Sequence, residues 1–405
     1  MIQRELYINE LEKYIDKPFI KVLTGIRRSG KSTILNLLRD KLLQRNIQKE
    51  QIIYLNFESF KYTHITTATK LYDYIKEKFD NEKRYYIILD EVQEVEHWEK
   101  AVNSFLVDFN ADIYITGSNS HLLSSELATF LAGRYLEFHI FPLSFKEYLV
   151  FKKQRANKTE DIYTEFETYL RYGGFPVLHT SDYSPGESYK IVYDIYSSVI
   201  LRDTIQKNNI RDIELLERVV KYAFDNIGNK FSGKNIADYF KSQQRKIDIN
   251  TIYNYIKALE SAFILHRVSR YDVRGKEILK TQEKFYTADM AILYSVMGYK
   301  DRLISGALEN IIMLELKRRG FSVFVGKLDQ LEIDFIAQKG NETVYIQIAY
   351  LLAGENTIER EFKPLLQVKN SYPKYVITMD KIFKDTIEGV KHMHIADFLN
   401  LETIV

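Results

Sequence analysis

Five short apolar runs mark the first part of the chain, at residues 19–24, 51–57, 84–89, 112–116 and 135–140. Runs of this length, rich in Ile, Leu, Val and Tyr and bounded by polar segments, are typical of buried strands. A helical pattern follows the first run directly, with an apolar face formed by Ile34, Leu35, Leu37, Leu38, Leu42 and Leu43. Buried strands of this kind indicate a parallel sheet, so residues 1–150 are expected to form an α/β domain.

The periodicity changes after residue 210. Helical spacing appears three times and is followed by two strand-like runs, at residues 215–223, 235–240, 250–261, 264–268 and 276–280. Three helices and a β-hairpin are the winged-helix arrangement, which is a variant of the helix-turn-helix. We therefore expect a winged-helix module over residues 211–290.

The last part of the chain returns to a mixed pattern. Residues 308–316 have the spacing of an amphipathic helix, and strand patterns follow at 322–325, 332–337 and 343–349. This order predicts a further α/β domain over residues 291–405.

The most specific motif lies between the first strand and the first helix, where residues 25–33 read GIRRSGKST. It is the GxxxxGK[ST] pattern in the strand–loop–helix context that a phosphate-binding loop requires. The glycines let the backbone curl with its amides toward phosphate oxygens, and the helix adds its positive amino end. Lys31 is expected to reach the β- and γ-phosphates and the Ser32 hydroxyl to reach Mg²⁺. The expected nucleotide-binding residues are Gly25, Ile26, Arg27, Arg28, Ser29, Gly30, Lys31, Ser32 and Thr33.

A second buried strand ends in two carboxylates, Asp90 and Glu91. Asp90 is expected to hold Mg²⁺, and Glu91 to polarise the attacking water. A Glu directly after the Asp favours ATP hydrolases of the AAA-like branch over kinases and GTPases. The sequence thus predicts an ATP–Mg²⁺ hydrolase in which Lys31 and Glu91 serve one reaction.

Two further strand ends carry polar side chains. In a sheet whose central strand leads into the phosphate-binding loop, Ser118 and Asn119 would lie beside the γ-phosphate and orient the lytic water. A capped turn before a helix is the alternative for these residues. Asn56 or Glu58 is a candidate to hydrogen-bond Glu91 and gate it.

Several segments together resemble a family of prokaryotic AAA-type ATPases. These segments read GIRRSGKST at 25–33, LDEVQ at 89–93, TGSNS at 116–120, LAGRY at 131–135 with FPLSF at 141–145, and YGGFP at 172–176. The resemblance runs essentially end to end. It implies a P-loop NTPase sheet of the AAA type and a C-terminal domain similar to restriction endonucleases.

The resemblance also draws attention to Arg134, which stands where AAA-type proteins carry an arginine finger. A finger places a fixed positive charge at the γ-phosphate of a neighbouring subunit, which would make the active form a homo-oligomer. A sensor acting within its own chain and a surface ion pair are the alternatives. Residues 151–210 are interpreted as a helical lid over the nucleotide, with Arg171 and Arg202 as candidate phosphate sensors.

The expected winged helix has a marked excess of positive charge. Residues 230–284 contain twelve Lys or Arg against six Asp or Glu. Such an excess suits contacts with the backbone of duplex DNA, through Lys257 on the third helix and Arg270, Arg274 and Lys276 on the wing. Winged helices also serve as protein-binding modules, so DNA and protein partners both stay open.

The C-terminal domain lacks part of the site that the resemblance implies. A restriction-type nuclease needs an acid on the helix, an Asp opening one strand, and Glu-x-Lys on the next. Glu309 and Asp334 meet the first two needs, but the third position reads Gln347-Ile348-Ala349. We therefore expect the fold without phosphodiester cleavage, and a vestigial site at Glu309, Asp334 and Gln347.

Composition removes several other classes. The chain has no Cys, which excludes disulfide frameworks, thiolate zinc sites and cysteine nucleophiles. Lys and Arg number 57 against 55 Asp and Glu, so net charge indicates no partner. The amino terminus has no signal-peptide pattern and no apolar run reaches the length of a membrane span, so we expect a cytoplasmic protein without membrane contact. The alternative to a DNA-associated ATPase is a signalling ATPase whose C-terminal half binds protein or a ligand.

Overall fold

The computed structural model describes residues 2–80, 82–117, 133–155, 160–242, 247–382 and 386–404. The chain forms two compact units. The first contains Met1–Ile140 with Ser261–Phe263, and the second contains Phe141–Glu260 with Ile264–Val405.

The first unit is built on a parallel sheet of five strands in the order β2-β3-β4-β1-β5. The strands are β1 (Ile20–Thr24), β2 (Ile52–Asn56), β3 (Tyr85–Asp90), β4 (Ala111–Thr116) and β5 (Tyr135–His139). They match the five apolar runs predicted from the sequence. Because all five strands are parallel, their carboxyl ends meet at one edge, where the residues after β1, β3 and β4 come together.

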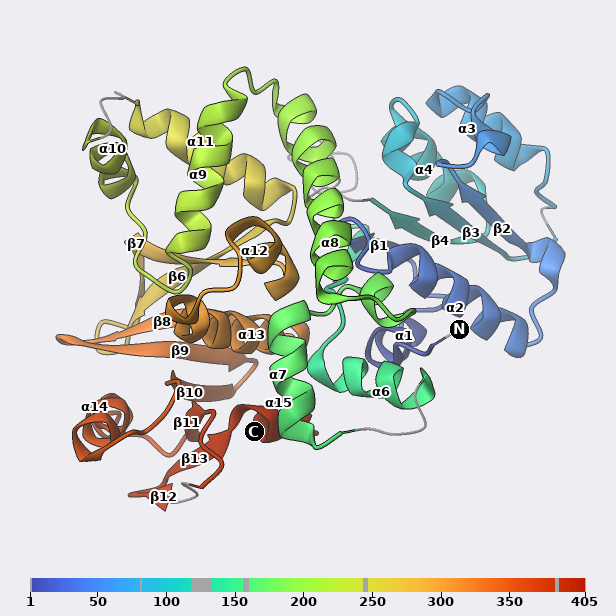
Figure 1. Cartoon of the computed structure of the whole chain (residues 1–405). Helices are drawn as coiled ribbons and strands as arrows, with labels where there is room; N and C mark the ends of the chain where they lie inside the picture. The colour runs from blue at the N-terminus through green and yellow to red at the C-terminus, as the bar shows by residue number, and fades with distance from the viewer. Residues whose placement is uncertain are drawn as a thin grey trace. The chain divides into compact units, whose positions relative to one another are not determined.

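Helices cover both faces of this sheet (Figure 1). On one face, α1 (Glu5–Glu12) and α2 (Lys31–Gln44) share a core with Leu23, Ile88 and Tyr114. On the other, α3 (Ala68–Lys76) and α4 (Trp98–Asp108) pack on Val22, Ile87 and Ile113. The strands are apolar on both faces because both are covered. Short 3₁₀ turns are η1 (Lys49–Gln51), η2 (Phe60–Tyr62) and η3 (Val92–Glu94).

The second unit begins with helices. They are α6 (Phe145–Arg155), α7 (Ile162–Tyr172), α8 (Pro185–Val199), α9 (Ile213–Asp225), α10 (Gly233–Ser242) and α11 (Ile249–Ser261), the last of which ends in the first unit. A 3₁₀ turn, η5 (Pro176–His179), precedes α8, and a π-helical segment, η6 (Ile200–Gln206), continues it. Helix α8 begins at Pro185. Ser184 and Glu187 form a capping box there, and Pro185 occupies the first turn, where proline is tolerated.

An eight-stranded sheet in the order β12-β13-β11-β10-β9-β8-β6-β7 forms the rest of this unit (Figure 1). The strands are β6 (Leu265–Asp272), β7 (Glu277–Thr287), β8 (Ser322–Leu328), β9 (Leu331–Lys339), β10 (Glu342–Ile348), β11 (Lys374–Thr378), β12 (Thr386–Ile387) and β13 (Val390–His394). The accompanying helices are α12 (Met290–Met297), η7 (Asp301–Leu303), α13 (Ile304–Arg318), α14 (Glu355–Leu366) and α15 (Ile395–Asn400).

The predicted hairpin of the winged helix lies in this same sheet. Strand β6 pairs with β7 in antiparallel fashion and with β8 in parallel fashion, with Arg270 opposite Val325. Residues 211–290 and 291–405 therefore contribute to one continuous sheet. The boundaries at 150, 210 and 290 stay predictions. None of the described helices is both long enough and apolar enough to cross a membrane.

The YGGFP segment at 172–176 owes its two glycines to close backbone contacts. Gly173 has a φ of 65°, and a Cβ there would overlap the carboxylate of Asp289. That buried carboxylate accepts hydrogen bonds from the amides of Gly174 (2.7 Å) and Ala291 (2.8 Å), and burial raises its pKa to about 7. A Cβ on Gly174 would overlap the carbonyl of Leu143. The motif thus fixes the turn after α7.

Replacing Gly173 with Ala is expected to lower the midpoint of thermal unfolding by at least about 5 °C, equivalent to roughly 2 kcal/mol. The added methyl group must displace Asp289, and Ala at a positive φ is itself strained. Gly186→Ala is the matched control, since a Cβ there meets nothing within 4 Å and the residue lies in the first turn of α8. Equal midpoints for the two variants would show that this turn tolerates a side chain.

Candidate nucleotide site

The loop between β1 and α2 has the backbone of an anion cradle. Gly25 has a φ of 136°, and a Cβ there would overlap the carbonyl of Ile140. Arg28 and Gly30 also have positive φ values, of 67° and 100°. Helix α2 begins at Lys31, immediately after this turn. Successive amides in such a turn, next to a helix amino end, form a concave site for phosphate oxygens.

Lys31 lies across the loop and faces the acidic pair. Its Nζ donates to the carbonyl oxygens of Gly25 at 3.0 Å and Ile26 at 3.4 Å. The same atom lies 3.8 Å from Oε1 of Glu91, and both side chains are almost fully buried. The loop and the end of β3, about sixty residues apart in the sequence, therefore meet as predicted.

Asp90 is buried and bonded to the two strands that flank its own, β2 and β4. Its Oδ1 accepts a hydrogen bond from the hydroxyl of Thr116 at 2.5 Å. Its Oδ2 accepts one from the hydroxyl of Tyr54 at 3.0 Å and one from the side-chain amide of Asn56 at 3.1 Å. Burial raises the pKa of Asp90, while hydrogen bonds from Thr116, Ser32 and Tyr54 oppose that rise. The Ser32 hydroxyl and the Asp90 carboxylate, the two predicted Mg²⁺ ligands, are thus in contact.

Glu91 is held in place by its backbone and by a neighbouring side chain. The residue adopts the left-handed conformation, with φ 55° and ψ 49°. Its N–H donates to Thr116 Oγ1 at 2.9 Å, and its Oε2 accepts the Gln93 amide at 2.6 Å. Thr116 therefore bridges Asp90 and Glu91. The sequence had placed Thr116 and Gln93 in motifs without giving either a role.

The side-chain hydrogen bond to Glu91 comes from neither of the residues expected to make it. Asn56 is paired with Asp90 in the register of β2 and β3, so its amide bonds Asp90 and not Glu91. Glu58 forms an ion pair with Arg27 at 3.1 Å. Both expectations for gating were wrong, and the structure gives that contact to Gln93. The predicted water-orienting residues Ser118 and Asn119 lie outside the described residues.

Arg134 lies away from the loop within the first unit. Its carbonyl accepts the N–H of Ile20, the first residue of β1, at 2.8 Å, and its guanidinium donates to Asn103 Oδ1 at 3.1 Å. The phosphate-binding loop leaves the other end of β1. The five residues of that strand span about 13 Å at roughly 3.3 Å per residue.

These groups fit a nucleotide phosphate chain with Mg²⁺. The loop presents backbone amides and the Lys31 ammonium, which bind phosphate oxygens, and the missing Cβ of Gly25 keeps the loop close to β5. A hydroxyl and a carboxylate, from Ser32 and Asp90, are oxygen ligands that Mg²⁺ prefers. Glu91 adds a second carboxylate beside Lys31.

The second unit brings together the three residues of the predicted vestigial site. Asp334 on β9 donates its N–H to Gln347 Oε1 on β10 at 3.3 Å. Glu309 on α13 and Asp334 lie 3.1 Å and 3.7 Å from the same cation, Lys284 Nζ on β7. In the described parts of the chain, no group of three or more His, Asp or Glu is arranged to hold a metal ion.

Lys284 is the residue of this cluster that the sequence analysis missed. Its side chain is 4% exposed, and it also lies 3.0 Å from Glu332 Oε1. The three carboxylates raise the pKa of Lys284 against the opposing effect of burial. Tyr286 donates to Glu309 at 2.9 Å, and Gln347 donates to Glu361 at 3.0 Å. Lys284 thus brings a positive charge from β7 into this cluster of carboxylates.

Part of the positive charge counted for a DNA surface is engaged within the protein. Arg274 forms an ion pair with Asp329, and Lys230 lies 2.8 Å from Glu332. Arg270 is buried and donates to Gln282. Asp329 and Glu332 lie outside residues 230–284, so a count over that window alone overstates the positive charge of the surface. Lys257 and Lys276 are exposed as expected.

The candidate sensors in the lid belong to the second unit. Arg171 lies over the ring of Tyr299, 5.0 Å from its centroid. Arg202 is exposed on the π-helical segment η6. Their roles at the nucleotide stay predictions.

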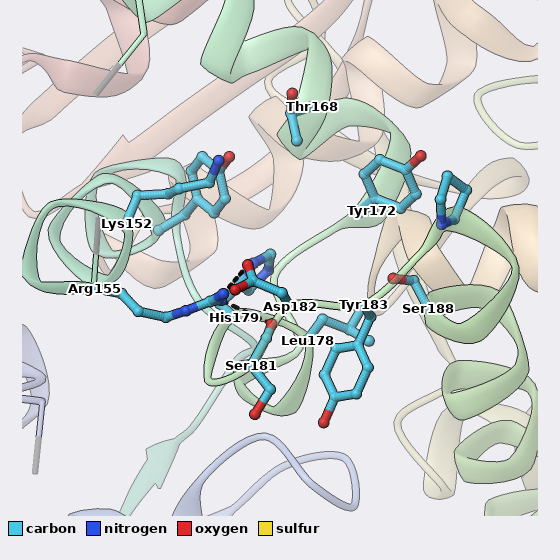
Figure 2. A pocket seen from close by; sticks show the side chains of 12 residues that line it. Lys152, Arg155, Thr168, Tyr172, Leu178, His179, Ser181, Asp182, Tyr183 and Ser188 are labelled. Carbon is cyan, nitrogen blue, oxygen red and sulfur yellow. Dashed lines mark hydrogen bonds and ion pairs between the residues drawn. The ribbon is translucent and has the colours of Figure 1, made fainter. Parts of the chain in front are cut away.

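A pocket of about 230 Å³ lies among α6, α7 and the start of α8 (Figure 2). Its charged lining groups are engaged with the protein itself. Arg155 donates to the carbonyl of Ser181 and pairs with Asp182, as the dashed lines show. His179 bonds the carbonyl of Gly173 at 2.9 Å, and burial lowers its pKa to about 4. We therefore interpret the pocket as part of the packing around the YGGFP turn.

Comparison with known proteins gives two domain matches. The profile of an AAA domain matches residues 17–149. The profile of a domain of unknown function (DUF8612) matches residues 163–303. The second match carries no stated activity, so the winged-helix and restriction-endonuclease-like interpretations stay predictions.

Relatives that match most of the chain occur in a bacterium and an archaeon. An uncharacterized protein of Haemophilus influenzae is 40% identical over 98% of both chains. An uncharacterized protein of Methanocaldococcus jannaschii is 31% identical over 92% of this chain and 86% of its own. Among solved structures, the Walker-type ATPase PABY2304 of Pyrococcus abyssi matches 73% of this chain and 96% of its own, with a TM-score of 0.51 and 14% identity. That likeness shows a shared fold.

Proposed function

This chain belongs to a family of AAA-domain proteins with relatives in H. influenzae and M. jannaschii, and we propose that it hydrolyses ATP to ADP and phosphate with Mg²⁺. The observation that carries the proposal is the meeting of Lys31 and Glu91, whose Nζ and Oε1 lie 3.8 Å apart at the mouth of the loop. A phosphate chain bound to the loop amides would lie between a cation and a base.

The chain's own groups divide the work. The loop amides and Lys31 bind the phosphates, and Ser32 with Asp90 would hold Mg²⁺, whose charge offsets that of the phosphate oxygens. Glu91 accepts a proton from the attacking water. The oxygen of that water bonds the γ-phosphorus, and the bond between the γ-phosphorus and the bridging oxygen of ADP breaks. Lys31 leaves the carbonyls of Gly25 and Ile26 for the phosphate, which frees Oε1 of Glu91 to face the water.

Phosphate release by the purified chain tests this proposal. With ATP and Mg²⁺ we expect continuous release of phosphate that stops when EDTA removes the metal. A chain that neither releases phosphate nor binds ATP would contradict the proposed function.

Gln93 has a definite part in this reaction. Its amide fixes Oε2 of Glu91, so Oε1 is the oxygen left to accept the proton of water. Replacing Gln93 with Ala is expected to lower kcat about tenfold to hundredfold, because loss of positioning near the reacting atoms has effects of that size. The affinity for ATP should stay close to wild type, since Gln93 contacts the base and not the loop.

Steady-state kinetics with ATP check this expectation. Glu94→Gln is the control, because Glu94 is exposed on the same 3₁₀ turn. A Gln93→Ala variant with unchanged kcat, or with a loss only in KM, would remove Gln93 from the mechanism.

Arg134 is proposed as an arginine finger that acts on a neighbouring subunit. Its position at the far end of β1 from the loop supports action between chains, because an arginine side chain does not span the roughly 13 Å of that strand. The proposal implies a homo-oligomer in the presence of ATP. A cis-acting sensor is not favoured by this placement.

The role of the second unit is proposed in two forms. In the first, nucleotide state changes the conformation of a winged helix that contacts duplex DNA through exposed lysines such as Lys257 and Lys276. In the second, the chain is a regulatory switch whose second unit binds protein or a ligand. The pairing of Arg274, Lys230 and Arg270 within the protein favours the second form.

Gel shift with duplex DNA, with and without ATP and across a salt series, separates the two. Binding that weakens steeply with salt supports DNA contact, and absent or salt-insensitive binding supports the switch. For the vestigial site, Lys284 among three carboxylates supports a domain without phosphodiester cleavage, because the ammonium occupies the space between the acids.

A further inference from the structure

Arg4 is a charged residue in an apolar core. It stands immediately before α1 and is 1% exposed, next to Tyr7, Ile8 and Leu11, which are themselves buried. Burying a guanidinium is costly unless hydrogen bonds compensate for the lost water. A chain that keeps arginine here has a specific use for its donors.

One of those donors reaches the phosphate-binding loop. Arg4 Nη1 donates to the carbonyl oxygen of Ser29 at 2.7 Å, and its Cζ lies 4.6 Å from the centroid of the Tyr7 ring. A charge-assisted bond of this length is among the stronger hydrogen bonds in proteins. The residue thus links the start of the chain to the middle of the loop, 25 positions later.

The carbonyl that Arg4 holds belongs to the most contorted part of the loop. Ser29 is fully buried and stands between Arg28 and Gly30, both of which have positive φ. The direction in which the Ser29–Gly30 peptide plane faces depends on the partner of the Ser29 carbonyl. An outside partner on the carbonyl therefore sets that orientation.

The planar peptide transmits this contact to the other side of the loop. In a trans peptide, C=O and the following N–H point in opposite directions. With the Ser29 oxygen turned toward Arg4, the N–H of Gly30 is turned away from the core and toward the concave side of the loop. That is the side on which α2 begins and where Lys31 lies.

We propose that Arg4 is a positioning residue for nucleotide binding: it holds the Ser29–Gly30 peptide so that the Gly30 amide faces the phosphates. The proposal rests on the proposed function of the loop. The positive charge of Arg4, buried behind the loop, also favours an anion on the other side of the loop. Arg4 does not touch the nucleotide, so its effect falls on affinity more than on the rate of the bound complex.

Replacing Arg4 with Met tests this role, because Met fills a similar volume without charge or donors. We expect Mg²⁺-ATP to bind about tenfold or more weakly by calorimetry, with KM raised in proportion and kcat changed by less than about threefold. Arg4→Lys keeps the charge and N–H donors but not the planar fork of the guanidinium, so it should restore part of the affinity. The full chain is used throughout, and circular dichroism at the assay temperature establishes that each variant is folded.

Arg45→Met is the matched control. Arg45 also links the first two helices, through an ion pair with Glu12 at 3.6 Å, but it follows the end of α2 and does not contact the loop. Its affinity for Mg²⁺-ATP should equal that of wild type. A loss in Arg4→Met that Arg45→Met does not share supports positioning and not a general loosening of these helices.

Three results decide the matter. Wild-type affinity and KM in a folded Arg4→Met variant would overturn the positioning role while leaving the ATPase proposal intact. Absence of ATP binding in the wild type would overturn both. Should Arg4→Met fail to fold, Arg4→Lys decides: weaker ATP binding with kcat retained supports the proposal, and unchanged binding refutes it.

Discussion

Lys31→Ala is expected to weaken Mg²⁺-ATP binding by at least about a hundredfold, roughly 2.7 kcal/mol, and to abolish measurable hydrolysis. The side chain is 4% exposed and lies over the loop, so a phosphate chain entering this site meets its ammonium in a place where water screens little.

Calorimetry with Mg²⁺-ATP measures the loss directly. Lys41→Ala is the control. Lys41 lies on the same helix but is partly exposed, and its Nζ lies 3.9 Å from Oε1 of Glu12. Its removal changes net charge equally and should leave affinity unchanged. Wild-type affinity in Lys31→Ala would show that nucleotide binds elsewhere.

Glu91→Gln is expected to lower the rate of hydrolysis by about 10²–10⁴ while leaving ATP bound, because general-base catalysis has effects of that size. The amide has the shape of the carboxylate and still offers an oxygen to Gln93, so the site keeps its structure. It has no lone pair basic enough to accept the proton of water.

Single-turnover phosphate release, together with calorimetry, separates the two effects. Glu94→Gln again serves as control, because it makes the same chemical change on the exposed side of the same turn. Normal turnover in Glu91→Gln would assign the base to another residue.

The features of this site that the sequence predicts are local ones. Strand, loop and helix around Lys31 follow one another directly, so apolar periodicity and glycine spacing suffice to place them. The acidic pair after β3 is likewise read from a single strand end. Parallel strands then bring both to one edge, which needs no knowledge of side-chain contacts.

The contacts that the sequence misses connect distant segments. Asp90 and Thr116 are 26 positions apart, and Arg4 and Ser29 are 25 apart. Nothing in the local pattern around Arg4 distinguishes it from a surface arginine. The predicted gate failed for the same reason: β2 pairs in register with β3, so Asn56 faces Asp90, one residue short of Glu91.

In the second unit, the sequence also misses ion pairs between residues that are distant along the chain. The positive excess over 230–284 was counted within a window, but Asp329 and Glu332 lie beyond it and pair with Arg274 and Lys230. Lys284, which was counted with the surface charge, is buried among carboxylates. The YGGFP segment was recognised only as a family motif, because Asp289, which bonds its turn, lies 115 positions from Gly174.

Nucleotide retained by Glu91→Gln tests the central claim most directly. The variant is mixed with ATP and Mg²⁺ and separated from free nucleotide, and the bound nucleotide is then released and identified. If Lys31 and the Asp90–Glu91 pair act on one triphosphate, about one ATP per chain is recovered intact, and adding Lys31→Ala removes it. Recovery of ADP, or of no nucleotide, would contradict the account.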